Sequence, residues 1–232
     1  MPENATPSLP GRPGPKRTLD VERVVAAAMG LLDEGGPTAL SVRAVAGRLG
    51  VRPNALYTYV SDRQALERAV VERVLAEADV ALLAGPARSW RSRLSAYAIA
   101  LRVVLLKHPG AVPLFMTAPM DGPTALLVGE QLIATLVSAG LSPADASRGA
   151  YLLIVQVLGS VALEVAETDG RPPLPPESER VAMRREALGG VPAEAFPWTA
   201  ATVDTAATWI TTTQFVWQVE LLLDGLAQRT NP

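Results

Sequence analysis

Residues 39–70 read ALSVRAVAGRLGVRPNALYTYVSDRQALERAV, in which Gly50 separates two short helical patterns. Each pattern has an apolar stripe at helical spacing: Val45, Ala46 and Leu49 in the first, Leu56 and Val60 in the second. Pro53 suits the first turn of a helix, where its missing N–H would be unpaired in any case. The pattern therefore predicts two short helices joined by a glycine turn.

A longer helix is predicted upstream of this pair, from Thr18 or Asp20, which are both suitable N-caps, to Asp33. The Gly-Gly-Pro run at 35–37 is expected to end it. Three helices in this order predict a helix-turn-helix, whose second helix enters the major groove of DNA with its N-terminal residues at base edges. The groove admits a single helix, so the pattern indicates double-stranded DNA as a partner.

The rest of the chain has helical patterns and no strand pattern of any length. Ser61 to Gln64 has the form of a capping box with Ser61 as N-cap, and it should open a helix that runs to about Leu83. Gly85-Pro86 is the expected domain boundary. Further helices are predicted at about 89–108, 123–139, 143–168, 177–188, 197–207 and 208–229. The expected fold is all-α: a disordered tail (1–17), a helix-turn-helix DNA-binding domain (18–84) and a larger helical domain (85–230).

The composition excludes several kinds of site. Cysteine is absent and histidine occurs once, as His108, which excludes thiolate chemistry and makes histidine-rich metal sites and most catalytic triads unexpected. No phosphate-binding glycine loop is recognisable. The N-terminus lacks the apolar region of a secretory signal, and the apolar run 150–166 is shorter than the ~20 residues of a membrane span. We expect a cytoplasmic protein that is not an enzyme, with no metal, cofactor or membrane partner.

The charge is unevenly distributed along the chain. The formal net charge of −2 is the sum of +2 over residues 1–75 (ten basic and eight acidic) and −4 over residues 76–232 (eleven basic and fifteen acidic). Residues 40–63 contain four arginines and one acid. Such asymmetry suggests a nucleic-acid partner, although a solvated surface gives the same pattern.

Residues 39–70 resemble the DNA-binding domain of the tetracycline repressor (TetR) family. The matching positions are Ser41, Arg43, Val45-Ala46, Leu49-Gly50-Val51, Leu56-Tyr57, Tyr59-Val60 and Leu66. The resemblance covers about residues 18–80. Residues 217–228, WQVELLLDGLAQ, also resemble the last helix of the tetracycline repressor branch. Between 85 and 215 only the order of the helices agrees.

The resemblance implies a set of DNA contacts. Asn54 would lie near base edges, where asparagine pairs well with adenine, and Arg63 would hold a phosphate at a helix N-terminus. Tyr57 and Tyr59 are expected to be exposed for DNA, because Leu56 and Val60 fill the inward positions; packing in the core is the alternative for both tyrosines. The full predicted set is Lys16, Arg17, Ser41, Arg43, Arg52, Pro53, Asn54, Ala55, Tyr57, Thr58, Tyr59 and Arg63.

The resemblance also implies that the C-terminal domain binds a small-molecule effector and forms a homodimer. The positions that recognise the drug in the tetracycline repressor fall on Asp79, Tyr97 and Leu114, and none is retained, so magnesium–tetracycline is not the expected effector. Candidate effector contacts are Trp90, Tyr97, Leu101, Met116, Tyr151, Gln156 and Trp209. Candidate dimer contacts on the helices 143–168 and 208–229 are Val155, Gly159, Ala162, Val216, Glu220 and Leu223.

Two further features bear on the C-terminal domain. Gln156, Ser160 and Glu164 form a polar stripe at i, i+4 and i+8, which is expected to face a pocket or a partner helix. His108 lies at a helix end, where it would cap carbonyl groups or interact with the helix dipole.

The predicted function is a repressor that binds a palindromic operator as a homodimer and is released by an effector. An activator or architectural DNA-binding protein of the same fold is the alternative.

Overall fold

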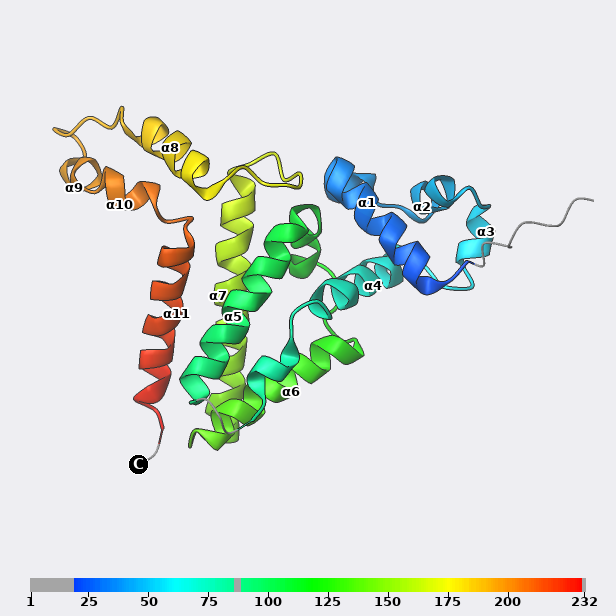
Figure 1. Ribbon diagram of the computed structural model, residues 1–232, viewed down its shortest axis with the longest axis horizontal. Helices are drawn as coiled ribbons and strands as arrows, with labels where there is room; N and C mark the ends of the chain where they lie inside the picture. The colour runs from blue at the N-terminus through cyan, green and yellow to red at the C-terminus, as the bar shows by residue number, and fades with distance from the viewer. Residues whose placement is uncertain (1–18, 86–88, 231–232) are drawn as a thin grey trace, which may run out of the picture.

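The computed structural model describes residues 19–85 and 89–230, and every regular element in these ranges is helical (Figure 1). Figure 1 shows a small domain at one end, joined by α4 to a larger domain in which α5, α6 and α7 lie centrally. The elements are α1 (Val21–Ala39), α2 (Val42–Leu49), α3 (Pro53–Leu56), α4 (Arg63–Leu75), η1 (Val80–Leu83), α5 (Trp90–Lys107), η2 (Pro109–Met116), α6 (Pro123–Ser138), α7 (Pro143–Ala166), α8 (Glu177–Leu188), α9 (Pro197–Ala201), α10 (Val203–Ala207) and α11 (Thr212–Ala227).

The helix-turn-helix of the small domain is confirmed. Ser41 is the N-cap of α2, where its Oγ accepts a 3.0 Å hydrogen bond from the backbone N–H of Ala44. Gly50 ends α2 with φ 69°, a left-handed conformation that glycine adopts without steric cost. Pro53 is the first residue of α3, and Leu56 is fully buried. Local chain chemistry therefore sets the angle between α2 and α3.

One predicted helix limit in the small domain was right in part and another was wrong. The Gly-Gly-Pro run interrupts the helical conformation, as predicted: Gly36 has φ 65° and ψ −166°, although a further turn follows this kink and brings α1 to Ala39. Asp62, rather than Ser61, is the N-cap of α4, because its Oδ1 accepts a 2.8 Å hydrogen bond from the backbone N–H of Ala65. That hydrogen bond lowers the pKa of the Asp62 carboxyl, and the Ser61 hydroxyl adds to the effect. The Asp62 carboxylate is a better acceptor than the Ser61 hydroxyl for the free backbone N–H groups at the start of α4, because its negative charge also interacts favourably with the helix dipole.

The remaining helices follow the prediction with four differences. The helix of the small domain expected to run to about Leu83 is divided into α4 and η1. The segment expected to be irregular contains the 3₁₀ helix η2, and the helix predicted at 197–207 is two short helices, α9 and α10, that meet at Thr202. The last helix begins at Thr212 rather than 208, because the Thr211 hydroxyl accepts from the backbone N–H of Gln214.

α7 is the central core helix of the larger domain. It contacts α5, α6 and α11, and its inner face, including Leu153, Val157 and Val161, is buried. Its 24 residues are long and apolar enough to cross a membrane by length and composition, a test that core helices of water-soluble proteins also pass. Its apolar character follows here from burial on one side.

The two domains meet chiefly where α1 contacts η2. Gly110 in η2 lies directly against the α1 backbone: a Cβ atom added there would stand 2.2 Å from the carbonyl oxygen of Leu32. No side chain could relieve this contact, because the atom that it meets belongs to the main chain. Only glycine allows α1 and η2 to approach so closely.

Replacing Gly110 by alanine is therefore expected to lower the free energy of unfolding by about 1–3 kcal/mol, the usual cost of overpacking. Gly129 in α6 is the matched control, because a Cβ there meets nothing within 4 Å. Gly129→Ala should raise stability by about 0.5–1 kcal/mol, as in other helix interiors. Urea unfolding measures both, and a Gly110→Ala variant as stable as the wild-type protein would contradict this account of the joint.

Candidate functional site

The surface of α2, α3 and the turn after α3 is built on a buried base. Leu56 and Val60 are 0% and 4% exposed, as predicted for the inward positions. Around them the structure exposes most of the predicted DNA contacts and half-buries Ser41 and Pro53. The exposed members are Arg43, Arg52, Asn54, Ala55, Tyr57, Thr58 and Arg63. Lys16 and Arg17 lie outside the described residues.

The arginines of this surface differ in their intramolecular partners. Arg43 and Arg52 form no hydrogen bond or ion pair with any described residue. Arg48, in contrast, donates two bonds of 2.7 and 2.8 Å to the Glu34 carboxylate, and the hydrogen bond lowers the pKa of Glu34 and raises that of Arg48. Within the described residues, Arg43 and Arg52 are thus the two free cations of the helix-turn-helix.

Arg63, predicted to hold a phosphate, is already engaged by the protein. Its Nε donates a 2.7 Å hydrogen bond to Glu67, and its Nη2 donates a 3.2 Å bond to the backbone carbonyl of Pro37. Its side chain is still 53% exposed, at the N-terminus of α4. A phosphate there would have to share this guanidinium with Glu67.

The prediction that both tyrosines are exposed was right for Tyr57 and wrong for Tyr59. Tyr57 is 53% exposed. Tyr59 is half-buried against the core, and its hydroxyl donates a 2.7 Å hydrogen bond to the backbone carbonyl of Leu19. Tyr59 therefore fastens the segment before α1 to the end of the helix-turn-helix and packs against the core, as the alternative interpretation had it, while its contact with DNA stays a prediction.

The two tyrosines should respond differently to loss of the hydroxyl. Tyr59→Phe is expected to lower the free energy of unfolding by about 0.5–1.5 kcal/mol, because the carbonyl of Leu19 loses its donor. Tyr57→Phe, an exposed substitution, should change it by less than about 0.5 kcal/mol. Thermal or urea unfolding compares the two variants, and equal effects would contradict the assignment.

The predicted effector contacts do not form one pocket. Tyr97 and Leu101 are each 1% exposed in the domain core, whereas Met116 and Tyr151 are 52% and 73% exposed. Trp90 is half-buried beneath the guanidinium of Arg91. The remaining two, Gln156 and Trp209, both line a hollow of about 670 Å³ between α7, α8, α11 and the segment that joins α10 to α11. The seven residues therefore lie in different environments, and their roles in effector binding stay predictions.

Tyr97 is the member of that set with an unusual environment. Its hydroxyl is buried and has no hydrogen-bond partner among the described residues, and burial raises the pKa of the phenol strongly. A buried hydroxyl without a partner costs free energy, and such groups are few in folded proteins. The core beside Tyr97 thus offers a polar group that a bound molecule could satisfy.

The predicted dimer contacts fall into three environments. Val155, 45% exposed, and Gly159 line the same hollow as Gln156. Glu220 accepts a 3.3 Å hydrogen bond from Arg91 of its own chain, and Ala162 and Val216 are half-buried. Leu223 is fully buried inside the subunit, so its assignment to an interface was wrong. Other large apolar side chains of the same helices are exposed: Leu152, Leu163, Trp217 and Leu221.

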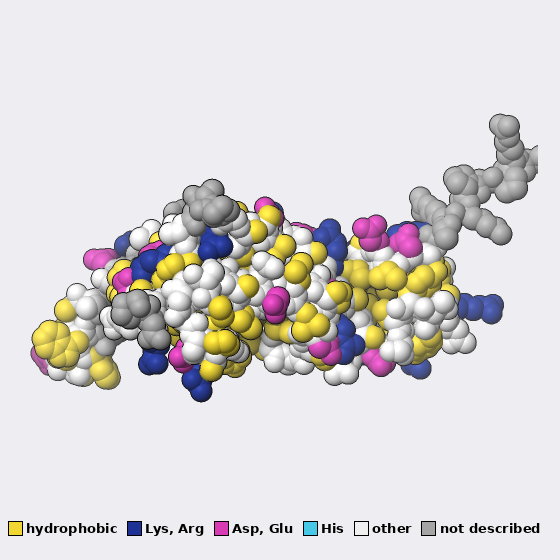
Figure 2. Space-filling view, turned by 90° about the horizontal axis from the view of Figure 1, so that it is seen from below, with side chains coloured by type: hydrophobic (Ala, Val, Ile, Leu, Met, Phe, Trp, Pro, Cys, Tyr) yellow, Lys and Arg dark blue, Asp and Glu magenta, His cyan; other side chains and the backbone are white. Residues whose placement is uncertain are grey.

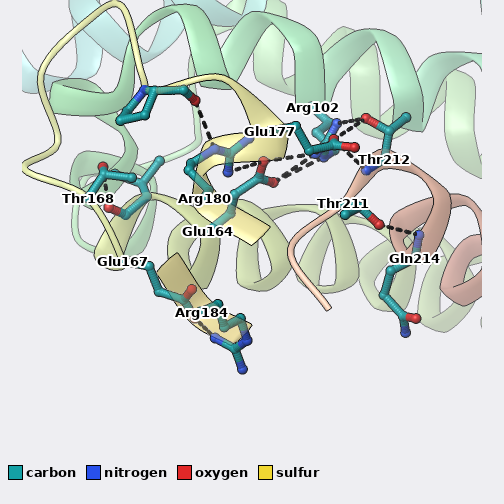
Figure 3. A network of polar contacts seen from close by, with 12 residues as sticks. Arg102, Glu164, Glu167, Thr168, Glu177, Arg180, Arg184, Thr211, Thr212 and Gln214 are labelled. Carbon is teal, nitrogen blue, oxygen red and sulfur yellow. Dashed lines mark hydrogen bonds and ion pairs between the residues drawn. The ribbon is translucent and has the colours of Figure 1, made fainter. Parts of the chain in front are cut away.

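The polar stripe on α7 is divided between two environments. Gln156 and Ser160 face the hollow, but Glu164 is buried in an ion network (Figure 3). Its carboxylate accepts from Arg102 of α5, with N···O distances of 2.9 to 3.2 Å, and from Arg180 of α8 at 2.7 Å. Arg102 also donates to the Thr212 hydroxyl at 3.0 Å. The network joins α5, α7, α8 and α11, and neither arginine was anticipated.

His108 lies at the C-terminal end of α5, as expected, but its partner is a carboxylate. Its Nε2 is 3.1 Å from Glu77 Oε2, while its Nδ1 is buried without a partner in the described chain. Asp33 of α1 belongs to the same region: burial raises the pKa of its carboxyl, and the charge of His108 opposes that shift. Among residues 19–85 and 89–230, no group of three or more histidine, aspartate or glutamate side chains could hold a metal ion.

Comparison with known proteins agrees with this architecture. The family model described as "Bacterial regulatory proteins, tetR family" matches residues 24–70, and the model "Tetracyclin repressor-like, C-terminal domain" matches residues 84–230. An HTH-type transcriptional regulator of Saccharopolyspora erythraea is 36% identical over 149 residues, which are 64% of this chain. The match spans 62% of that relative's own length, about three-fifths.

Two solved structures are similar over nearly the whole chain. A possible TetR family transcriptional regulator from Streptomyces coelicolor A3(2) has a TM-score of 0.76 and 32% identity, covering 90% of this chain and 99% of that one. The Streptomyces coelicolor protein ActR, solved in complex with actinorhodin, has a TM-score of 0.78, with 93% and 100% covered; at 24% identity this likeness shows the fold. Because the C-terminal model alone matches more than half of the chain, the protein belongs to the tetracycline repressor (TetR) family of bacterial regulatory proteins.

Proposed function

We propose that this protein is a ligand-responsive transcriptional repressor that binds a palindromic DNA operator as a homodimer and is released by a small-molecule effector. The observation that carries the proposal is the pair of exposed arginines, Arg43 and Arg52, which have no partner among the described residues and belong to the same helix-turn-helix as the exposed Asn54 and Tyr57. Unpaired cations suit phosphate and guanine contacts, and asparagine suits adenine. A cytoplasmic location is part of this proposal, because the protein must reach the DNA that it regulates.

The route from effector to DNA is proposed to run through α4 and α6. The Glu72 carboxylate of α4 accepts hydrogen bonds of 2.7 and 3.0 Å from the backbone N–H groups of Thr124 and Ala125 at the start of α6. One turn earlier, Arg68 donates a 2.6 Å bond to Asp121. α4 thus holds the first turn of α6 and the residue just before its N-cap. A shift of α6 would move α4 and, with it, the helix-turn-helix.

The effector is proposed to bind in the core of the larger domain beside Tyr97. The buried, unpartnered hydroxyl would donate to a polar atom of the bound molecule, and Leu94 and Leu101, at helical spacing from Tyr97 in α5, are buried and apolar. Sites of this kind combine an apolar lining with a few polar groups. ActR, similar in fold, binds actinorhodin, so that compound is a rational first probe.

The proposal is tested by fluorescence anisotropy with an operator duplex obtained by selection from random DNA. Affinity should lie in the range of about 10⁻⁸–10⁻¹¹ M near physiological salt and fall steeply with added salt. An effector should reduce it by about 5- to 150-fold. Equal affinity for the selected and a scrambled duplex would contradict the DNA-binding role, and tighter binding with effector would contradict release.

A further inference from the structure

We propose that Gln156, Ser160 and Gln218 form a recognition element that pairs with its own two-fold copy and makes the subunit select itself over other subunits of the same fold. The inference rests on the proposed homodimer and concerns a property that dimer formation alone does not imply. The three residues come from α7 and α11, which lie side by side along the larger domain (Figure 1).

The three side chains already form one connected cluster within the subunit. Gln156 Nε2 donates hydrogen bonds to Ser160 Oγ at 2.8 Å and to Gln218 Oε1 at 2.9 Å. Ser160 Oγ donates to the same Oε1 at 3.2 Å. All three side chains line the hollow of about 670 Å³. The cluster is therefore ordered before any partner binds.

On α7 the surface around the cluster is apolar, and the two charged side chains that line the hollow, Glu167 and Arg184, form an ion pair with each other. Residues 149–163 contain no Asp, Glu, Lys or Arg. Large apolar side chains on both helices are about half exposed or more: Leu152 49%, Val155 45%, Leu163 70%, Trp217 58% and Leu221 50%. Contiguous exposed apolar surface marks an interaction site, and depletion of charge is the compositional signature of an interface core.

Other exposed apolar side chains lie elsewhere on the molecule. Near α9, Phe196 is 56% and Trp198 is 83% exposed, and Figure 2 shows hydrophobic side chains gathered at that end, far from the small domain. The α7–α11 surface combines exposed apolar side chains with a polar cluster whose hydrogen-bonding groups are only partly used.

The unused hydrogen-bonding groups of the cluster indicate which partner fits. Within the described chain, Gln156 Oε1 is an acceptor without a donor, and Gln218 Nε2 is a donor without an acceptor. A two-fold interface brings the same patch of both subunits together. In the proposed dimer, Gln218 Nε2 of each subunit therefore donates to Gln156 Oε1 of the other subunit. A partner with apolar side chains at these positions would bury both groups unpaired.

Gly159 makes such an approach possible. It lies between Gln156 and Ser160 in α7, and a Cβ added to it would meet nothing within 4 Å. The surface at the cluster therefore has no side chain at this position that would hold a partner helix away. A buried polar residue in an otherwise apolar helix interface is known to specify register and partner at some cost in stability, and the cluster has this composition.

The test is a competition between subunits. A Gln156→Leu/Gln218→Leu variant has apolar groups in place of both amides, and it is mixed with tagged wild-type protein under conditions that allow subunit exchange. Native mass spectrometry then measures the proportion of heterodimer. We expect each protein alone to be dimeric, and the heterodimer to be about 5- to 100-fold rarer than statistical mixing gives, because the wild-type amides lose their partners.

Gln131→Leu is the matched control, because Gln131 is a half-buried glutamine on α6, outside the α7–α11 surface. It should mix with the wild-type protein in the statistical proportion.

If the double variant does not fold, the single Gln156→Met variant is used. We then expect the heterodimer with the wild-type protein to be depleted in the same direction but by a smaller factor. Statistical mixing by a folded amide variant would overturn the inference while leaving the homodimer intact. A wild-type monomer in analytical ultracentrifugation at micromolar concentration would overturn the homodimer and this inference together.

Discussion

Replacing Glu164 by alanine is expected to lower the free energy of unfolding by about 3–5 kcal/mol, among the largest effects of any single substitution in this chain. The side chains of Glu164, Arg102 and Arg180 are 2%, 4% and 7% exposed, so water cannot replace the missing carboxylate. Arg102 would keep Thr212 and the more distant Glu177 as partners, and Arg180 would keep the carbonyl of Pro175. The two arginines would remain buried with most of their compensating charge removed.

Urea unfolding at a fixed protomer concentration measures this effect, because dimerisation makes stability depend on concentration. Asp204→Ala is the matched control: it removes one side of the Arg185–Asp204 ion pair, whose side chains are 51% and 87% exposed. Exposed pairs of this kind contribute about 0–1 kcal/mol. A Glu164→Ala variant no less stable than Asp204→Ala would show that the buried network does not hold α5, α7 and α8 together.

Replacing both Arg43 and Arg52 by alanine is expected to weaken operator binding by about 100-fold or more. Each arginine that touches a base or phosphate contributes about 1–3 kcal/mol, and the slope of log affinity against log salt should become shallower by about one for each phosphate left without its arginine. Neither side chain has a partner among the described residues. Stability should therefore change by less than about 0.5 kcal/mol.

Fluorescence anisotropy over a salt series checks this expectation, with thermal unfolding run on the same samples. Arg185→Ala is the control, since Arg185 is an exposed arginine of α8 in the other domain. It should leave both operator affinity and salt slope unchanged. Wild-type affinity in the double variant would remove Arg43 and Arg52 from the DNA interface.

The features that were predictable from the sequence are those that depend on neighbouring residues. Ser41 and Ser142 cap helices because their hydroxyls accept from N–H groups three residues ahead, a spacing that the sequence shows directly. Gly50 permits the left-handed turn, and Leu56 and Val60 are buried because they lie on one face of α3 and the turn that follows it. These local rules were sufficient to predict the helix-turn-helix.

The features that were not predictable depend on contacts between distant segments. Tyr59 meets the carbonyl of Leu19, 40 residues away, and Glu164 meets Arg102, 62 residues away. Leu223 was a candidate dimer contact, but packing of α11 against both α5 and α7 buries it inside the subunit. An apolar helix with two packed sides has a wider buried face than its sequence indicates, and only the tertiary arrangement shows which side remains open.

Selection of bound duplexes from a pool of random DNA sequences tests the central claim most directly, using the full-length chain without added ligand. Two helix-turn-helix units in a homodimer reach successive major grooves about 34–36 Å apart. The enriched sequences should therefore be palindromic, with half-site centres about one helical turn apart, and the Arg43→Ala/Arg52→Ala variant should enrich them poorly. Enrichment of no sequence, or of a single site without two-fold symmetry, would contradict the proposal that this protein regulates transcription as a homodimer on a palindromic operator.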